Sequence, residues 1–415
     1  MLVLYRLLIN IIIVLSPIII LVRLIKKKED LIRFKEKFCY FSKKRGPGKI
    51  VWFHGASVGE LLSIIPLVKK LEEHKDINKI LITSTTLSSA NVFSRFKFKK
   101  TNHQFFPIDS NFLTKKFLDY WQPSIAIFID SEIWPNMLSN LKKKSIKHIL
   151  LNARITKKSY KRWRLISFYS RKLFSNFDAV YPQNLETKNY LNKLGAQNII
   201  EIGNLKFSEN ESELNFASQS KIQRLIKRKE LWCASSTHNF EEMICAEAHK
   251  NLKHKYSNLL TIIIPRHIHR VKDITLSIEK IGLNVHHHSS NKKMKKNTDI
   301  YLVDTFGETK DFFKISKIVF LGGSIIKHGG QNPLEAARFG CKILHGKHTK
   351  NFHDIYKLLK KNKQSTQVNS YKQISNSIEK IFKNKSYSKI FVKQMVKMGD
   401  EVLSKTKKEI IDLIK

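Results

Sequence analysis

The stretch KIVWFHGASVGELLSIIPLVKKL, residues 49–71, decides the fold class of this 415-residue chain. Its first part, Lys49–His54, is apolar enough for a buried strand, and Glu60–Leu71 has the spacing of an amphipathic helix. Between them, Gly55 and Gly59 permit a tight turn and a close approach of a ligand to the backbone. A buried strand that turns directly into a helix is typical of a parallel α/β sheet.

The same alternation of short apolar strands and amphipathic helices runs through the rest of the chain. In the first half we expect a helix at Ser159–Phe174 and further strands at Lys79–Ser84, Ser124–Asp130, Lys147–Leu151, Asp178–Tyr181 and Asn198–Ile202. In the second half we expect helices at Phe240–Leu252 and Pro333–Phe339 and strands at Leu231–Ser235, Leu259–Pro265, Leu283–His286, Ile300–Val303, Ile318–Gly322 and Lys342–His345. The polar stretch Gly203–Leu214 separates the halves, so two α/β domains with a cleft between them are predicted.

The N-terminus has a different composition. Leu7–Ile25 is almost wholly apolar and approaches the ~20 residues that a helix needs to cross a bilayer. Three lysines follow at positions 26–28, which by the positive-inside rule places the rest of the chain in the cytoplasm. No small-residue cleavage site follows, so a cleaved signal peptide is not expected. Because Pro17 would kink the helix, a shallow insertion into one leaflet competes with a full span.

The net charge limits the partners. Lysine and arginine total 76 against 34 acidic residues, so the formal charge is +42. Such a field favours nucleic acid, anionic lipid or a phosphorylated substrate. Part of the excess fits a nucleotide bias in the coding DNA, and the lysines are spread along the chain instead of forming one basic arm. The four cysteines form no C-x-x-C pair and no zinc-finger spacing, so we expect free thiols in a reducing compartment.

Polar residues follow the expected strands of the first half, at the edge where parallel sheets bind ligands. Ser57 and Glu60 have the spacing of a helix-capping box, while Glu60 is also suited to be a general base for a sugar hydroxyl. The second segment, residues 130–136, contains two carboxylates, a tryptophan and an asparagine. Its structural alternative is a helix that Asp130 or Ser131 caps, with Pro135 in the first turn.

The third segment is Asn152–Arg154, which a mixed basic and aromatic stretch follows at residues 157–164. That mixture suits phosphate or lipid headgroups, and it equally suits a solvated helix face.

Three segments of the second half suggest an anion or nucleotide site. Hydroxyl residues end the strand before a helix at Ser235 and Ser236, Arg266 and His267 follow the next strand, and glycine pairs flank a loop at residues 322–330. Asn332 then precedes a helix carrying Glu335, which can reach ribose hydroxyls. The chain has no Walker A loop, no G-x-G-x-x-G fingerprint and no D-x-D. The run His286–His288 is expected to lie at the surface and not to bind metal.

Nine motifs in order resemble the Kdo (3-deoxy-D-manno-octulosonic acid) transferases of Gram-negative bacteria. They run through the chain from about Arg33 to its end and read HGASVGE, DSEIWPN, NARIT with a following KSY, YPQN, GNLKF, SSTH, IPRH, FLGGS and GGQNPLEAA. Each motif alone is weak, but their order and spacing leave little room for chance.

The resemblance implies a GT-B fold, in which two Rossmann-like domains face a cleft, preceded here by an N-terminal membrane-anchor helix. The corresponding domains are residues 1–28 (anchor), 29–205 (acceptor-binding) and 206–415 (donor-binding), and the helix near Glu401–Ile414 is expected to pack back on the first domain. The implied donor is CMP-Kdo, the acceptor is the lipid A precursor, and the reaction is inverting without metal or other cofactor. The implied location is the cytoplasmic face of the inner membrane, whose anionic surface is a further partner, and no nucleic acid partner is expected.

Residue by residue, the resemblance makes Glu60 the catalytic base and Glu132 a second functional carboxylate. Acceptor-side roles extend to Asp130, Asn136 and Arg154. The donor-binding residues would be Ser235, Ser236, Arg266, His267, Gly322, Gly323, Ser324, Gly330, Asn332 and Glu335.

The chain departs from the family pattern at two positions: Asp130 stands where the family often has glutamate, and Cys39 stands where a glycine is usual, in an expected turn. Two alternatives remain. One is another GT-B enzyme that transfers a different nucleotide sugar, such as a UDP-sugar, to a membrane lipid. The other is a degenerate enzyme fold that binds a membrane surface or nucleic acid.

Overall fold

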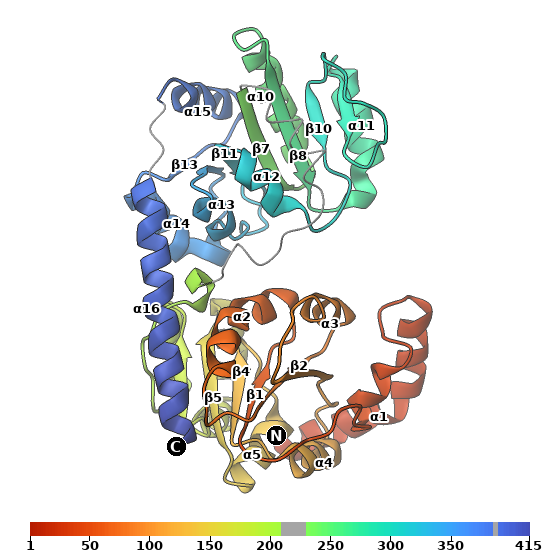
Figure 1. The fold of residues 1–415 in the computed structure, drawn as a ribbon, viewed down its shortest axis with the longest axis vertical. Coiled ribbons are helices and arrows are strands. Elements are labelled where there is room, and N and C mark those ends of the chain that lie inside the picture. The colour runs from red at the N-terminus through yellow and green to blue at the C-terminus, as the bar shows by residue number, and fades with distance from the viewer. Residues whose placement is uncertain (209–229, 385–388) are drawn as a thin grey trace. The chain divides into compact units, whose positions relative to one another are not determined.

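The computed structural model describes residues 1–208, 230–384 and 389–415, in two compact units (Figure 1). Unit 1 comprises Met1–Asn210 and Met398–Lys415, and unit 2 comprises Glu211–Lys397. The part of the polar stretch 203–214 beyond residue 208 lies outside the described residues. Each unit is built on a parallel sheet with helices packed on it, which confirms the predicted α/β class with two Rossmann-like domains.

The sheet of unit 1 has six strands in the order β3-β2-β1-β4-β5-β6, all paired in parallel. Their bounds are β1 Ile50–His54, β2 Lys79–Ser84, β3 Thr101–Phe105, β4 Ile125–Ile129, β5 Lys147–Ala153 and β6 Ala179–Pro182. The strand order reverses between β1 and β4, and in open parallel sheets this switch point is where ligands bind. The predicted strand at Asn198–Ile202 is wrong, since Ile199 forms only an isolated bridge with Val180.

The helices of unit 1 alternate with the strands. They are α1 Leu2–Ile25, α2 Val58–Glu72, α3 Leu87–Phe93, α4 Asn111–Trp121, α5 Pro135–Lys143, α6 Lys157–Leu165, α7 Ser167–Phe174 and α8 Leu185–Lys193. The single helix predicted at Ser159–Phe174 is two helices, because Ile166 leaves helical geometry at φ −120° and ψ 47°.

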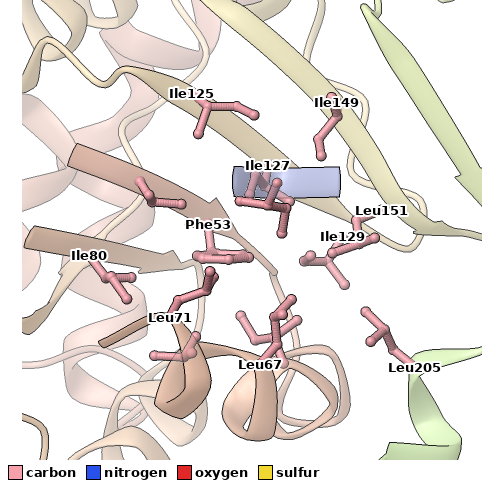
Figure 2. Close-up of a cluster of buried hydrophobic side chains, with 14 of the residues drawn as sticks. Phe53, Leu67, Leu71, Ile80, Ile125, Ile127, Ile129, Ile149, Leu151 and Leu205 are labelled. Carbon is pink, nitrogen blue, oxygen red and sulfur yellow. The ribbon is translucent and has the colours of Figure 1, made fainter. Parts of the chain in front are cut away.

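Strand β1 lies inside the sheet, between β2 and β4, and hydrophobic layers cover both faces of the sheet there. Val51 and Phe53 point into one hydrophobic layer, where Figure 2 shows Phe53 surrounded by neighbours that include Leu71 of α2 and Ile127 of β4. Trp52 points into the opposite layer, which α4 and α5 cover. The residues that follow β1 and β4 are therefore carried on a rigid support.

The last helix, α16 (Lys389–Ile414), contributes its C-terminal part to unit 1. Val402, Ile410 and Ile414 join the hydrophobic layer around Phe53. Lys49 Nζ donates to the Ile414 carbonyl at 3.1 Å, and Lys147 Nζ donates to the Leu413 carbonyl at 2.7 Å. Cations at these carbonyls complement the negative end of the helix.

Helix α1 is held to unit 1 near both of its ends. Near its start, Tyr5 Oη donates to Asp109 at 2.8 Å and Arg6 Nε donates to Asn136 Oδ1 at 2.9 Å. Near its end, Arg23 Nε donates at 2.6 Å to Glu29, whose side chain is almost wholly buried. Among the described residues, α1 is the one helix long and apolar enough to cross a membrane, and only 11% of its most apolar window is buried.

The sheet of unit 2 has seven parallel strands in the order β13-β12-β11-β7-β8-β10-β9. The strands are β7 Glu230–Thr237, β8 Leu259–Pro265, β9 Val285–His287, β10 Ile300–Leu302, β11 Ile318–Leu321, β12 Lys342–His345 and β13 Ser365–Gln367. The helices are α10 Glu241–Lys253, α11 Val271–Lys280, α12 Thr309–Ile315, α13 Leu334–Arg338, α14 His353–Lys361 and α15 Tyr371–Lys383. Here the order reverses between β7 and β11, which makes their carboxyl ends the second switch point.

The surface position predicted for the run His286–His288 is wrong for its last residue. His288 is buried, its Nδ1 lies 2.8 Å from Tyr301 Oη, and its Nε2 lies 3.0 Å from a Glu308 carboxylate oxygen. These contacts give His288 a structural role in unit 2.

Candidate active site

Glu60 lies at the switch point of unit 1, in the first turn of α2. Its backbone N–H donates to Ser57 Oγ at 3.3 Å, and its carboxylate accepts from the backbone N–H of Ala56 at 2.6 Å and of Ser57 at 3.3 Å. These bonds confirm the predicted capping box. Glu60 therefore has a fixed side chain at the end of β1, and the cap is compatible with a further chemical role.

The surroundings of Glu60 disfavour its charge. Burial raises the pKa of Glu60, and the negative charges of Glu132 and Asp130 raise it further, while hydrogen bonds from Ser57 oppose the shift. A carboxylate whose pKa is moved toward neutrality accepts a proton more readily in a reaction. A perturbed pKa at a switch point is typical of a catalytic base.

Glu132, after β4, is held by two ring N–H groups. His54 Nε2 lies 3.2 Å and Trp134 Nε1 lies 2.8 Å from the same carboxylate oxygen. His54 is buried and stacks on Phe106 at 3.8 Å between ring centroids. The side chain that raises the pKa of Glu60 thus has a defined position.

Both ring nitrogens of His54 have polar neighbours. Nδ1 lies 2.9 Å from Thr83 Oγ1 and 3.2 Å from the Thr83 carbonyl oxygen, and that hydroxyl accepts from Trp52 Nε1 at 2.9 Å and donates to the Phe53 carbonyl at 3.3 Å. At Nε2 the neighbour is Glu132, and since an ionised carboxylate only accepts, a hydrogen bond there places a ring proton on Nε2.

Asp130 and Arg154 meet at the same edge of the sheet. Asp130 is buried with φ +62°, and its carbonyl accepts from the Arg154 backbone N–H at 2.9 Å. Burial raises the pKa of Asp130, while the charges of Lys206 and Arg154 oppose the shift. Lys206 Nζ lies 3.7 Å from Asp130, so Lys206 of the GNLKF motif belongs to this cluster although it was not predicted as a site residue.

Asn136, for which an acceptor-side role is predicted, connects α1 to the rest of unit 1. Its side chain donates to the Asp109 carbonyl at 2.6 Å and accepts from Arg6, so it ties α1 to the domain. The predicted cap by Asp130 or Ser131 is wrong. Asp109 caps α5 instead, accepting from the backbone N–H of Asn136 at 3.0 Å and of Met137 at 2.8 Å.

In unit 2, the carboxyl ends of β7 and β11 are in close contact. Gly322 donates its N–H to the Ser235 carbonyl at 2.9 Å. A Cβ at Gly322 would lie 2.3 Å from the Ser236 carbonyl oxygen, so no other residue fits here without a backbone shift. The predicted segments at Ser235–Ser236 and Gly322–Ser324 are thus brought together.

The buried side chain of Glu241 organises the glycine loop. Its carboxylate accepts from the N–H groups of His238 (3.0 Å), Gly323 (2.6 Å), Ser324 (3.1 Å) and Ile325 (3.0 Å). These loop N–H groups are therefore bound by a protein carboxylate, and the nucleotide site predicted at this loop stays a prediction. Glu241 was not predicted as a site residue.

The remaining predicted residues of the loop have structural bonds. The Ser324 hydroxyl donates to the Leu321 carbonyl and accepts from the Gly346 N–H at 2.8 Å. The Gly330 N–H donates to the Gly323 carbonyl at 2.8 Å. Asn332 Oδ1 accepts from the Leu334 N–H at 3.1 Å, at the start of the helix that carries the partly buried Glu335.

Cationic and imidazole groups gather beside this loop. The His238 ring lies 4.3 Å from that of His328 and 5.7 Å from that of His267, and both Arg266 and His267 are exposed. Burial lowers the pKa of His238 to about 4, and the positive charges of His328, His267 and the nearby arginines add to the effect. The cluster suits an anion. No group of three or more potential metal-ligating residues was found in residues 1–208, 230–384 and 389–415.

Comparison with known proteins identifies the family. A sequence model of the family described as "3-Deoxy-D-manno-octulosonic-acid transferase (kdotransferase)" matches residues 32–209. A 3-deoxy-D-manno-octulosonic acid transferase of Rickettsia bellii is 35% identical, over 87% of this chain and 86% of that protein. The chain belongs to the Kdo transferase family. The Kdo transferase of Haemophilus influenzae is 31% identical, over 89% of this chain and 87% of its own length.

Solved structures show the same fold at lower identity. A UDP-GlcNAc 2-epimerase of Neisseria meningitidis superposes with a TM-score of 0.60 at 15% identity, covering 88% of this chain and 99% of its own. A glycosyltransferase of Rickettsia africae gives a TM-score of 0.56 at 11% identity, covering 89% and 100%. The predicted GT-B class is confirmed, and membership of the Kdo transferase family makes the chain a glycosyltransferase.

Proposed function

We propose that the chain transfers Kdo from CMP-Kdo to the lipid A precursor (lipid IVA), with inversion at the anomeric carbon and without metal. One observation carries the proposal: Glu60, with a raised pKa, lies at the switch point of unit 1 beside the fixed carboxylate of Glu132. A carboxylate base is what an inverting transfer to a sugar hydroxyl needs.

In the proposed reaction, Glu60 takes the proton of an acceptor hydroxyl as its oxygen attacks the anomeric carbon of Kdo. The bond from that carbon to the CMP phosphate oxygen breaks, and CMP leaves with the electron pair. Attack opposite to the leaving group inverts the configuration. Arg154 and Lys206, close to Asp130, would hold a phosphate of the acceptor.

The donor would bind in residues 206–415 and the acceptor in residues 29–205. The exposed Arg266 offers positive charge for the phosphate or the Kdo carboxylate, and the rings of His267, His238 and His328 beside it offer hydrogen-bonding nitrogens. Glu335 and Asn332 would contact the ribose, and Gly322 would set the loop close against the Ser235–Ser236 segment, so that both present their backbone to the nucleotide.

The membrane is the natural place for such an acceptor. In this proposal residues 1–28 attach the protein to the cytoplasmic face of the inner membrane, and the net charge of +42 adds attraction to anionic lipid.

The proposal predicts the mass of one product. The purified protein is incubated with lipid IVA and CMP-Kdo in the presence of a chelator, and the lipid is weighed by mass spectrometry. We expect lipid heavier by one or more Kdo units, with inhibition by CMP but not by UDP. Inhibition by UDP alone would indicate another nucleotide sugar, and no product from protein that binds CMP would contradict the acceptor.

A further inference from the structure

A pocket of about 380 Å³ lies beside the proposed base site, entirely within unit 1. Leu4 and Leu8 of α1 form one wall, and Trp134 and Trp163 line it from the domain. Its volume is within the ~300–1,000 Å³ of small-molecule sites, and a mainly hydrophobic and aromatic lining suits an apolar occupant.

The pocket and the proposed active site share one residue, Glu132. Glu132 lines the pocket, and the same carboxylate accepts from His54 and Trp134 and raises the pKa of Glu60. An occupant of this pocket therefore has its apolar part among the tryptophans and can present a polar part to the carboxylates.

Helix α1 contacts the rest of unit 1 through some of its side chains and exposes others to the surroundings. Tyr5 and Arg6 bind it to Asp109 and Asn136, next to the pocket. On the adjoining stripe of the helix, Leu7, Ile11 and Ile18 are 56%, 56% and 63% exposed. Such a row of apolar side chains is stable in a lipid surface and not in water.

We propose that this pocket binds one fatty acyl chain of the acceptor lipid, drawn from the membrane past α1. The inference rests on the proposed function. An amphiphile is the one ligand class that meets all three features: an apolar interior, a polar end at Glu132, and a wall that reaches the lipid phase. The chain would orient the acceptor headgroup toward Glu60.

Thiol protection tests the pocket without a need for turnover. The four native cysteines are buried, so a maleimide will label the introduced thiol of Leu8→Cys. With lipid IVA at ten times its dissociation constant, we expect labelling of Leu8→Cys to slow about tenfold. Deacylated acceptor and phosphatidylglycerol vesicles should give no protection. The matched control is Leu15→Cys, on the same helix but outside the pocket, whose labelling lipid IVA should not change.

Kinetics give a second measurement. The larger side chain of Leu8→Trp occupies part of the pocket, so about two methylene groups of the acyl chain would lose their place in it. We therefore expect the KM for lipid IVA to rise about tenfold. The kcat should change little, and Leu15→Trp should leave both constants unchanged.

The outcomes separate the two proposals. Protection of Leu8→Cys by phosphatidylglycerol alone, equal protection by deacylated acceptor, or no protection would overturn the acyl-chain site even if Kdo is transferred. Absence of transfer by the unsubstituted protein would instead overturn the proposed function.

Discussion

Replacing Glu60 with glutamine is expected to lower kcat by about 10²–10⁴-fold, the usual contribution of a general base. Glutamine keeps the length of the side chain and can still close the capping box with Ser57, so the fold should be retained. The measurement is the initial rate of Kdo transfer at saturating substrates, with circular dichroism as the check on folding.

Ser57→Ala is the matched control for the cap. It removes the hydroxyl that accepts from the Glu60 N–H and donates to the Glu60 carboxylate at 2.9 Å, while the backbone N–H groups of Ala56 and Ser57 still hold the carboxylate. We expect a loss of about 1 kcal/mol in the free energy of unfolding. Because the Ser57 hydroxyl lowers the pKa of Glu60, its removal raises that pKa, and most of the transfer rate should be retained at alkaline pH, where Glu60 is ionised. If Glu60→Gln kept the full rate while Ser57→Ala lost it, Glu60 would be a cap and not a base.

Replacing Glu241 with alanine is expected to destabilise unit 2 by at least about 3 kcal/mol. Four backbone N–H groups donate to this carboxylate, and each buried donor left unpaired costs ~1–3 kcal/mol. The loop at Gly323–Ile325 should lose its conformation, and CMP binding should weaken with it. Urea unfolding of the purified protein in detergent, followed by CMP titration, measures both effects.

Two variants on the same helix complete this test. Glu241→Gln replaces an acceptor oxygen with an amide donor and should lose a large part of the same stability. Glu247→Ala, at an exposed position of α10, should change the free energy of unfolding by less than about 0.5 kcal/mol. Similar stability of Glu241→Ala and Glu247→Ala would contradict the role given to Glu241.

Hydrophobic patterning was sufficient to predict most strands of the two sheets. The strands at Leu259–Pro265 and Lys342–His345 were predicted to the residue, because their central residues are apolar and they lie in parallel sheets. Strand β3 was missed because its sequence, TNHQF, is mostly polar. Asn198–Ile202 has strand-like residues but finds only one backbone bridge, and no local pattern reveals whether a partner strand exists.

Two local features were predicted correctly for physical reasons. The spacing of Ser57 and Glu60 gave the capping box, which depends on contacts within one turn. The turn expected at Cys39 has φ +60°, the left-handed conformation in which a glycine would be less strained.

The site contacts that could not be predicted from the sequence join segments that are far apart along the chain. His54 and Glu132 are 78 residues apart, and Glu241 is 82 to 84 residues from the loop that it organises. Each of these side chains also fits an ordinary cap or strand end, so only the folded chain shows its partner. The motifs HGASVGE and GNLKF did contain His54 and Lys206, which was the one available signal.

The pH dependence of kcat/KM tests the paired carboxylates most directly. Glu60 must be ionised to act as a base, and its pKa is raised by burial and by the charge of Glu132, so activity should fall at a pH above the ordinary glutamate range as the solution is acidified. Glu132→Gln removes that charge and lowers the pKa of Glu60. We therefore expect the acid limb of Glu132→Gln to move to lower pH, whatever its absolute rate. An acid limb that stays in place, or moves to higher pH, would contradict the pairing of Glu60 with Glu132.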